Sequence, residues 1–223
     1  KGEGFIFLVA TISLIAVALG VAALIIVMSV MNGFRAELFD KIVGLNGHAV
    51  VQGYGGRLSD WRDVLKDVRE TPGVVEASPL IEQPLLATSE GRVEAILARG
   101  MEVRDILTNP TLKGKTLAGD MKSLRPGSER VAIGSRLAQN LGVRLGQRIT
   151  IINPAGRTTP FGTVPREISY EIAAIFEVGV YDYDKAFVIM PIEDAQILML
   201  MGDQIGMIEF TATDADQVND ILA

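Results

Sequence analysis

The sequence predicts an α+β domain with a mixed sheet, carried on one N-terminal helix that crosses a membrane and continues as a stalk. Residues 5–34 contain no charged side chain, which predicts the membrane-spanning helix. Residues 35–42 combine charged positions with apolar ones at four-residue spacing, which predicts the stalk. From residue 48 onward, short strand-like runs alternate with short helical ones, which predicts the α+β part.

The uncharged run is long enough to span a bilayer. It lies between Glu3 and Arg35, and a helix needs only about 20 apolar residues to cross the hydrocarbon. A secretory signal has a shorter apolar core, of about 7–15 residues, that ends at a cleavage site. A buried core helix would need protein on all sides, and the polar remainder is not built for that. Ala16 and Gly20 have the spacing of closely packed membrane helices, so we expect a neighbouring helix.

The helical pattern continues beyond the uncharged run. Phe34, Leu38 and Ile42 recur every four residues and would form one apolar face of a helix. Gly44 and Gly47 are typical of a helix end. We therefore expect the membrane helix to leave the bilayer as an amphipathic stalk that stops near residue 45.

The remainder is predicted to contain short strands and helices in alternation. Ser59 and Asp60 precede a helical apolar run and are expected to cap it. Residues 89–91 separate two β-rich runs as in a hairpin turn, and residues 181–185 are expected to form a polar turn. The predicted strands are 48–52, 74–88, 92–99, 131–133, 147–152, 168–178, 186–190 and 205–213, and the predicted helices are 61–70, 101–107, 135–141, 192–200 and 214–223.

Composition excludes several classes of protein. The 223 residues carry 21 basic and 27 acidic side chains, a net charge of −6, and no Lys/Arg cluster suited to a phosphate backbone, so we expect no nucleic-acid partner. The absence of cysteine excludes disulfides, thiolate metal sites and cysteine nucleophiles in this sequence. Without the apolar helix, the remaining residues are enough for one domain or two small interleaved ones.

Two motifs resemble ligand sites but are incomplete. Residues 113–116, Lys-Gly-Lys-Thr, match the end of a phosphate-binding loop whose first glycine would fall at residue 109. That residue is Asn109, so we predict no nucleotide site in this chain. His48 is the only histidine and has no cysteine to complete a ligand set, so we predict no metal site.

Catalytic chemistry is not predicted either. Carboxylates that lie close together in sequence can act as an acid and base pair. Here a polar turn between strands explains them more simply, and no serine lies in a nucleophile-elbow context. We therefore expect no catalytic residue. The carboxylates concerned are Glu167, Glu171, Glu177, Asp182 and Asp184.

Residues 153–166 are predicted to form a functional loop. The segment has about fourteen residues, and connections of that length are usually functional or disordered. Three prolines stiffen it, and Pro160-Phe161 and Val164-Pro165 place apolar groups on an exposed arm, which favours a protein contact. The alternative is a mobile hairpin tip without a function of its own.

The sequence has the features of a piece of a larger protein. It begins with Lys1 rather than methionine, and the predicted helix 214–223 continues to the last residue. We therefore expect a larger parent protein.

The first helix and the globular part both resemble known permeases. Residues 29–34, Ser-Val-Met-Asn-Gly-Phe, with 37–38 and 42–45 after them, closely resemble the first span and exit helix of the lipoprotein-releasing permeases LolC and LolE. The turn at 141–147, Leu-Gly-Val-Arg-Leu-Gly-Gln, is similar to the periplasmic domain of MacB- and FtsX-type transporters. The resemblance covers essentially the whole sequence, and Met-Asn-Gly-Phe at 31–34 is its most specific part.

The resemblance implies a subunit of an ABC transporter in the bacterial inner membrane. Such permeases have four spans, with a large periplasmic domain between the first and the second, so the domain after residue 45 would be periplasmic. They pair with a second permease and with two copies of a cytoplasmic ATPase that binds ATP and magnesium, which leaves no cofactor in this chain. They extract outer-membrane lipoproteins and pass them to the periplasmic carrier LolA.

The resemblance also implies how the sequence is divided. Residues 1–45 would be the transmembrane helix and stalk of a MacB-like domain. Residues 46–100 and 205–223 would form its porter-type α/β part, and residues 101–204 an inserted, strand-rich Sabre-type part.

Two sets of contact residues are predicted, one from the family and one from the side chains of the span. Segment 153–166 takes the place of the hook with which LolC grips LolA, which favours a LolC-type subunit, whereas Gly47-His48 is more like LolE. A permease that pairs with an identical copy would reconcile the two. Met28, Met31 and Phe34 are candidates for contact with acyl chains, with plain helix packing as the alternative. The predicted hook residues are Pro154, Arg157, Pro160, Phe161, Val164, Pro165 and Arg166.

Two other functions remain open from the sequence. A MacB-like exporter would use the same domain to couple the membrane to a periplasmic adaptor. An FtsX-like regulator would use it to activate periplasmic hydrolases without transport.

Overall fold

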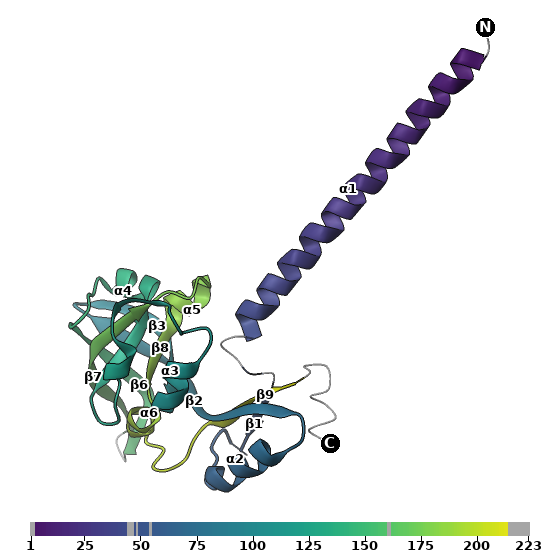
Figure 1. Cartoon of the computed structure of the whole chain (residues 1–223). Coiled ribbons are helices and arrows are strands. Elements are labelled where there is room, and N and C mark those ends of the chain that lie inside the picture. The colour runs from purple at the N-terminus through teal and green to yellow at the C-terminus, as the bar shows by residue number, and fades with distance from the viewer. Residues whose placement is uncertain (1–2, 44–46, 48, 54, 160–161, 214–223) are drawn as a thin grey trace. The chain divides into compact units, whose positions relative to one another are not determined.

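The computed structural model describes residues 3–43, 47, 49–53, 55–159 and 162–213 (Figure 1). The chain divides into two compact units, Lys1–Ile42 and Val43–Ala223, which are described separately. The predicted helix 214–223 and the predicted hook residues Pro160 and Phe161 lie outside the described residues.

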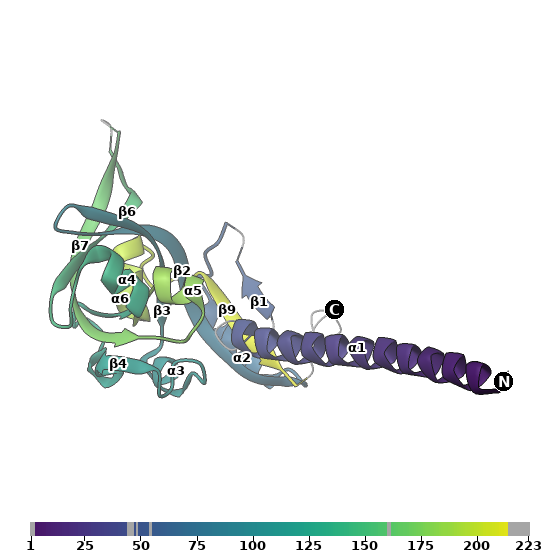
Figure 2. The same cartoon turned by 90° about the horizontal axis from the view of Figure 1, so that it is seen from above.

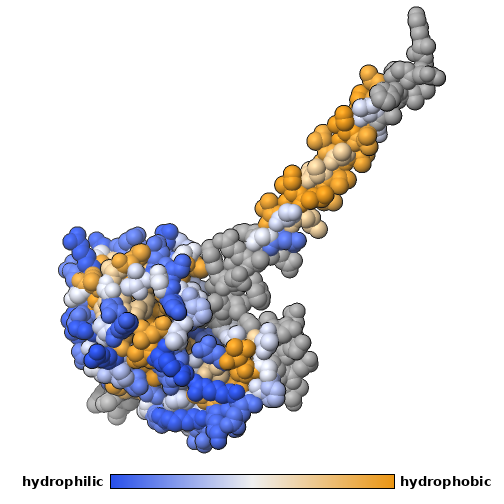
Figure 3. Space-filling view, viewed as in Figure 1, coloured by the Kyte–Doolittle hydropathy of each residue, from blue (hydrophilic) through white to orange (hydrophobic). Residues whose placement is uncertain are grey.

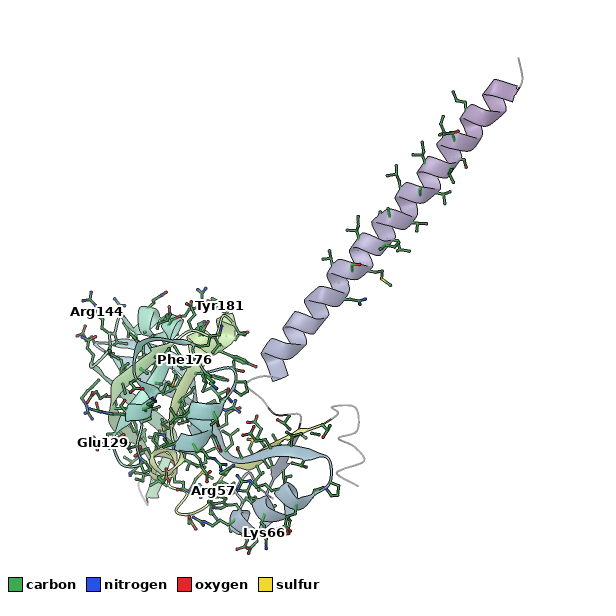
Figure 4. All side chains as sticks on the ribbon, in the orientation of Figure 1. Arg57, Lys66, Glu129, Arg144, Phe176 and Tyr181 are labelled. Carbon is green, nitrogen blue, oxygen red and sulfur yellow. The ribbon has the colours of Figure 1, made fainter. Side chains whose placement is uncertain are left out.

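The first unit is one uninterrupted helix. α1 spans Glu3–Val43 and contains the apolar stretch Thr11–Gly33, 23 residues with a mean hydropathy of 2.9, none of which is buried. At 1.5 Å per residue this stretch extends about 34 Å, more than the ~30 Å of bilayer hydrocarbon. Its visible surface is mostly apolar in Figure 3, and its side chains project on every side of the helix in Figure 4. The predicted membrane helix is confirmed in length and composition, and the helix continues through the predicted stalk.

The second unit contains nine strands and five α-helices among its described residues. Most of the predicted elements are confirmed within a few residues. The strands are β1 (Ala49–Gln52), β2 (Val74–Ser89), β3 (Arg92–Met101), β4 (Thr116–Gly119), β5 (Arg130–Gly134), β6 (Arg148–Thr159), β7 (Gly162–Phe176), β8 (Phe187–Pro191) and β9 (Met207–Ala212). The helices are α2 (Trp61–Glu70), α3 (Val103–Thr108), α4 (Ser135–Leu141), α5 (Tyr181–Ala186) and α6 (Ile192–Met199), with a 3₁₀ turn, η1 (Met121–Ser123).

The strands form one mixed sheet that closes on itself. The order is β1-β9-β2-β3-β8-β5-β7-β4, and β6 pairs with both β2 and β7. The six strands β2, β3, β8, β5, β7 and β6 therefore form a closed circuit, as in a small barrel. β2 is shared, because its first part pairs with β9 and its second part with β3 and β6. The predicted division into porter-type and Sabre-type parts stays a prediction.

Strand β8 shows why the sheet is apolar throughout. All five of its residues are buried, and alternate side chains of a strand point to opposite faces. Val188 and Met190 join one apolar cluster, which also contains side chains of α2, α4 and α6. Phe187 and Ile189 join the other cluster, together with Ile106 of α3. Both faces of this strand are therefore covered, which explains its continuous apolar sequence.

Local sequence features explain where two helices begin and end. α4 ends at Gly142, whose φ of +70° suits glycine and whose N–H donates to Gln139 O at 3.1 Å. α2 begins after Asp60, but the predicted side-chain cap is wrong, because Asp60 has φ −92° and ψ 38° and makes no side-chain bond to the helix. A capping residue usually has extended backbone angles. Trp61 of α2 instead donates to Asp203 O at 2.8 Å.

Two segments with polar sequences are more regular than predicted. Residues 181–185 belong to helix α5 rather than to a turn, because Asp184 is buried and accepts N–H groups from Val178 at 2.8 Å and Gly179 at 3.0 Å. These bonds hold the entry to the helix. The stretch between α3 and β5, to which no strand or helix was assigned from the sequence, contains strand β4 and the turn η1.

Candidate functional site

The predicted functional loop is the outer part of a long β-hairpin. β6 and β7 pair antiparallel from Arg148↔Glu171 as far as Thr159↔Gly162. β6 also pairs with β2, but only as far as Leu86↔Ile152. Beyond that pair the two strands continue alone, and their paired ends project past the other strands of the unit (Figure 2). We call residues 153–166 the arm.

The prediction of an irregular loop for the arm is therefore wrong. That prediction rested on the length of the segment, with three prolines expected to stiffen it, and proline cannot donate a hydrogen bond to a ladder. Edge strands and bulges tolerate proline, and both strands of the arm are edge strands. The described ladder pairs Arg157 with Val164, Thr158 with Thr163 and Thr159 with Gly162.

A bulge separates the arm from the barrel. Between the pair Asn153↔Arg166 and the pair Arg157↔Val164, β6 has two residues more than β7. A Cβ atom on Gly156 would overlap the carbonyl oxygen of Val164 and lie 2.7 Å from the amide nitrogen of Arg166. Only glycine allows this approach of the two backbones, so Gly156 permits the bulge.

Asn153 fixes the base of the arm. Its side chain is 6% exposed and donates through Nδ2 to the carbonyl oxygen of Leu198 in α6 at 3.3 Å. Its Oδ1 accepts the N–H of Ala155 at 3.0 Å, inside the bulge. The buried amide of Asn153 thus links the barrel, helix α6 and the bulge. It fixes the direction in which the arm leaves the barrel.

The described surface of the arm combines exposed apolar groups with restricted backbone. Val164 is 56% exposed, and Pro154 and Pro165 are exposed. Arg166 is half-buried, and its Nε is buried with no hydrogen-bond partner among the described residues. Arg157 belongs to β6. The structure therefore brings five of the seven predicted hook residues together on one hairpin.

Tyr170 of β7 and Asp194 of α6 are two buried groups that can lose a proton. Tyr170 is 1% exposed, and burial raises the pKa of its hydroxyl well above the usual range, with Asp194 adding to the rise. Asp194 of α6 is 3% exposed, and burial raises the pKa of its carboxyl to about 6. The N–H of Gly127, 3.1 Å from Asp194 Oδ1, opposes that rise. Asp194 therefore changes charge near pH 6.

The acyl-chain candidates all lie on α1. Met28 and Met31 are 59% and 52% exposed and belong to the stretch Thr11–Gly33. Phe34 follows that stretch in the same helix. Their contact with acyl chains stays a prediction.

The carboxylates considered for acid and base chemistry have separate surroundings. Glu171 lies 3.3 Å from Arg130, and Glu177 accepts a long bond of 3.5 Å from Ser135. Asp184 accepts the N–H of Val178 just before α5, while Glu167 and Asp182 are exposed. These groups do not converge on one site. Within the described residues, no group of three or more His, Cys, Asp or Glu could hold a metal ion.

A buried ion network was missed by the sequence reasoning. Arg99 of β3 is 0% exposed, and its Nη2 lies 2.7 Å from Glu209 Oε2 and 2.9 Å from Glu209 Oε1. Its Nη1 lies 3.3 Å from Glu82 Oε2. Burial raises the pKa of Glu82 above its usual value, and the charge of Arg99 opposes that rise. The available signal was a charged residue within the apolar run 95–101.

Comparison with protein families places the whole domain in one class. Residues 10–223 match the family model of the MacB-like periplasmic core domain. The chain therefore belongs to this family. The predicted fold class, a MacB-like α+β domain after one apolar helix, is confirmed.

The most informative relatives are lipoprotein-releasing system transmembrane proteins. The chain is 31% identical over 219 residues to LolC of Neisseria meningitidis, covering 96% of this chain and 52% of the relative. It is 31% identical over 207 residues to LolC of Xylella fastidiosa (93% and 50%) and 27% identical over 216 residues to LolE of Haemophilus influenzae (93% and 50%). The chain thus spans about half the length of these relatives. The predicted resemblance to LolC and LolE is confirmed.

Two solved structures also match the chain. The extracellular domain of the transporter YknZ has a TM-score of 0.49 at 12% identity, covering 75% of this chain and 79% of that one. The periplasmic region of MacB from Actinobacillus actinomycetemcomitans has a TM-score of 0.46 at 10% identity, covering 79% and 78%.

Proposed function

We propose that this chain is the first membrane span and the periplasmic domain of a permease subunit in a lipoprotein-releasing ABC transporter. The arm carries the proposal: it is a two-stranded projection with exposed apolar side chains, on a chain 31% identical to LolC. In this role the chain helps to extract outer-membrane lipoproteins from the inner membrane, and the arm binds the periplasmic carrier LolA.

The other subunits of the proposed transporter have separate roles. A second permease, either a paralogue or an identical copy, completes the membrane part, and a cytoplasmic ATPase dimer binds ATP and magnesium. This chain supplies no catalytic residue and no cofactor. Its domain after residue 45 lies in the periplasm, where the lipoprotein and the carrier meet it.

The geometry of the arm suits the binding of another protein. Proline and a paired backbone restrict the free arm, so less conformational entropy is lost when a partner binds. Val164 and Pro165 give the partner apolar surface to cover. Asn153 and the Gly156 bulge fix where that surface begins.

The acyl-chain part of the proposal concerns the membrane helix. Met28, Met31 and Phe34 lie near the end of the apolar stretch, and flexible thioethers suit variable lipid chains. Photo-cross-linking from these positions should capture bound lipoprotein. Labelling of a neighbouring helix alone would mean that these residues serve helix packing.

A charge on the arm tests the carrier contact. Val164→Asp in the full-length complex should lower LolA binding at least about tenfold, which corresponds to ~1.4 kcal/mol. The reason is that a buried contact would have to remove water from the new carboxylate, which costs more than this. LolA pull-down measures the effect. Val93→Asp is the matched control, since Val93 is 58% exposed on β3. Combined replacement of Pro160, Phe161 and Pro165 should give the same loss while ATPase assembly is intact.

The outcomes separate the competing functions. Unchanged LolA binding by Val164→Asp would remove the arm from the carrier interface. A wild-type complex that binds a periplasmic adaptor and not LolA would be a MacB-like exporter. A complex that activates hydrolases and releases no lipoprotein would be an FtsX-like regulator.

A further inference from the structure

The buried ion network joins three neighbouring strands. Glu82 of β2 lies directly opposite Arg99 of β3 in the ladder, and Glu209 comes from β9, on the other side of β2. Arg99 is fully buried, while Glu82 and Glu209 keep side-chain exposures of 26% and 14%. The ring of Phe187 lies 5.9 Å from the guanidinium carbon. The network therefore holds its arginine in an apolar layer by two carboxylates.

The same network holds the beginning of the domain. The N–H of Gly47 donates to Glu209 Oε1 at 2.6 Å. A Cβ atom on Gly47 would lie 2.6 Å from Glu209 Cγ and 2.6 Å from the carbonyl oxygen of Phe210. Gly47 therefore lies so close to β9 that a side chain has no room.

Stability alone is a weak reason for such a network. Taking charged groups out of water costs free energy, and apolar replacements of buried ion pairs are often neutral or stabilising. The best-attested role of buried charges is to fix one arrangement among several. Here one carboxylate binds both Arg99 and Gly47, so the arrangement that is fixed is the position of Gly47 on the sheet.

The position of Gly47 in the sequence gives this contact a mechanical meaning. α1 ends at Val43, and only three residues lie between Val43 and Gly47. Four peptide units reach at most about 14 Å, so Gly47 follows the end of α1 closely along the chain. Among the described residues, Gly47 is therefore the first after α1 through which movement of that helix can act on the domain.

We propose that Glu209 is a positioning residue that latches Gly47 to the sheet and so transmits movement of α1 to the periplasmic domain. The inference rests on the proposed function, in which the transporter cycle moves α1. Gly47, Glu209, Arg99 and Glu82 form the latch. If the latch failed, the membrane helix would be free to move without turning the sheet.

Gly47→Ala opens the latch without changing a charge. The added methyl group should separate Gly47 from Glu209 while the contacts of Arg99 with Glu82 and Glu209 persist. In the full-length protein within its complex, hydrogen–deuterium exchange of β1 amides should rise about tenfold and that of β8 amides should stay unchanged. Val50→Ala is the matched control, because Val50 is 45% exposed on β1. Unchanged exchange in Gly47→Ala would overturn the latch.

A distance measurement tests the transmission itself. Cysteines introduced at Val30 of α1 and Val93 of β3 can each carry one spin label, with any cysteine elsewhere in the complex replaced. ATP should change the distance between the labels in the wild type and in Val50→Ala. In Gly47→Ala the change should fall to less than half. A full change in Gly47→Ala, or no change in the wild type, would overturn the proposal.

A second variant and the composition of the sample keep the test decisive. Where Gly47→Ala does not assemble, Glu209→Gln serves instead, since it weakens the hold on Arg99 and should likewise reduce the ATP-dependent change. The sample contains neither lipoprotein nor LolA. Failure of carrier binding would therefore overturn the proposed function and leave the latch result standing.

Discussion

At the scale of single residues, Asp194 shows how burial sets a charge. Its carboxyl lies in the first turn of α6 with 3% exposure, and its pKa is raised to about 6. The ordinary value for Asp is about 3.9, so the folded state holds the proton more tightly than the unfolded state. Between those two values, the free energy of unfolding should fall as the pH rises, because the folded carboxyl must ionise in a buried place.

Replacing Asp194 by Asn should remove this pH dependence. Asn keeps an oxygen for the N–H of Gly127 and carries no charge. Asp194→Asn should therefore be more stable than the wild type by roughly 1–2 kcal/mol at pH 7.5, with the difference vanishing near pH 4. Denaturant unfolding at several pH values measures it. Glu76→Gln, at an exposed position on β2, is the control, and a pH-independent difference would contradict the explanation.

The latch residues mark the limit of prediction at this scale. Arg99 was predicted only as part of a strand, and its unusual position in an apolar run was visible in the sequence. Its partner Glu209 lies 110 residues away, so the pairing depends on how β9 joins β2. Side-chain spacing along a strand carries no information about that distant strand.

At the scale of elements, the arm shows where local sequence signals mislead. The fourteen residues 153–166 were predicted as one long loop stiffened by three prolines, yet the chain forms two paired strands there. The backbone tolerates Pro154 and Pro165 because the arm has free edges and a bulge. Helix α4, by contrast, was predicted at its observed bounds, since Gly142 ends it by a purely local contact.

A side chain at Gly156, in the bulge, should disturb the arm more than the barrel. Gly156→Ala forces the added methyl against the Val164 carbonyl, so the arm must shift relative to Asn153. We expect LolA binding to fall about tenfold, equivalent to ~1.4 kcal/mol, with a small change in unfolding midpoint. Titration of the full-length complex with LolA measures the effect. Ala155→Ser, at the exposed neighbouring position, should bind normally, and normal binding by Gly156→Ala would show that the bulge is not needed.

At the scale of the whole domain, one sheet joins the parts that the family resemblance separates. The first half of β2 pairs with β9, and its second half belongs to the closed circuit of strands. The alternation of strands and helices predicted the α+β class. The closed circuit was not predictable, because it depends on β6 pairing with β2 across more than sixty residues of sequence.

Shared strands should make unfolding cooperative. Phe176→Ala in the barrel and Phe210→Ala on β9 each remove a buried ring, of 0% and 2% exposure, which costs about 3–5 kcal/mol. Both variants should lower the midpoint of one common transition, measured by denaturant unfolding with two spectroscopic probes. Two separate transitions in Phe210→Ala would instead define residues 46–100 and 205–223 as an independent unit.

The bulge at Gly156 also has an evolutionary consequence. Among the described residues, β6 makes its last ladder contact with β2 at Ile152, and no strand besides β7 pairs with the arm. Mutations, insertions or recombination beyond Asn153, whose buried amide binds α6, change no strand pair of the barrel. Selection for folding and selection for a partner thus act on different stretches of one hairpin. A lineage of such permeases could acquire a new partner by exchanging the arm and inheriting the barrel unchanged.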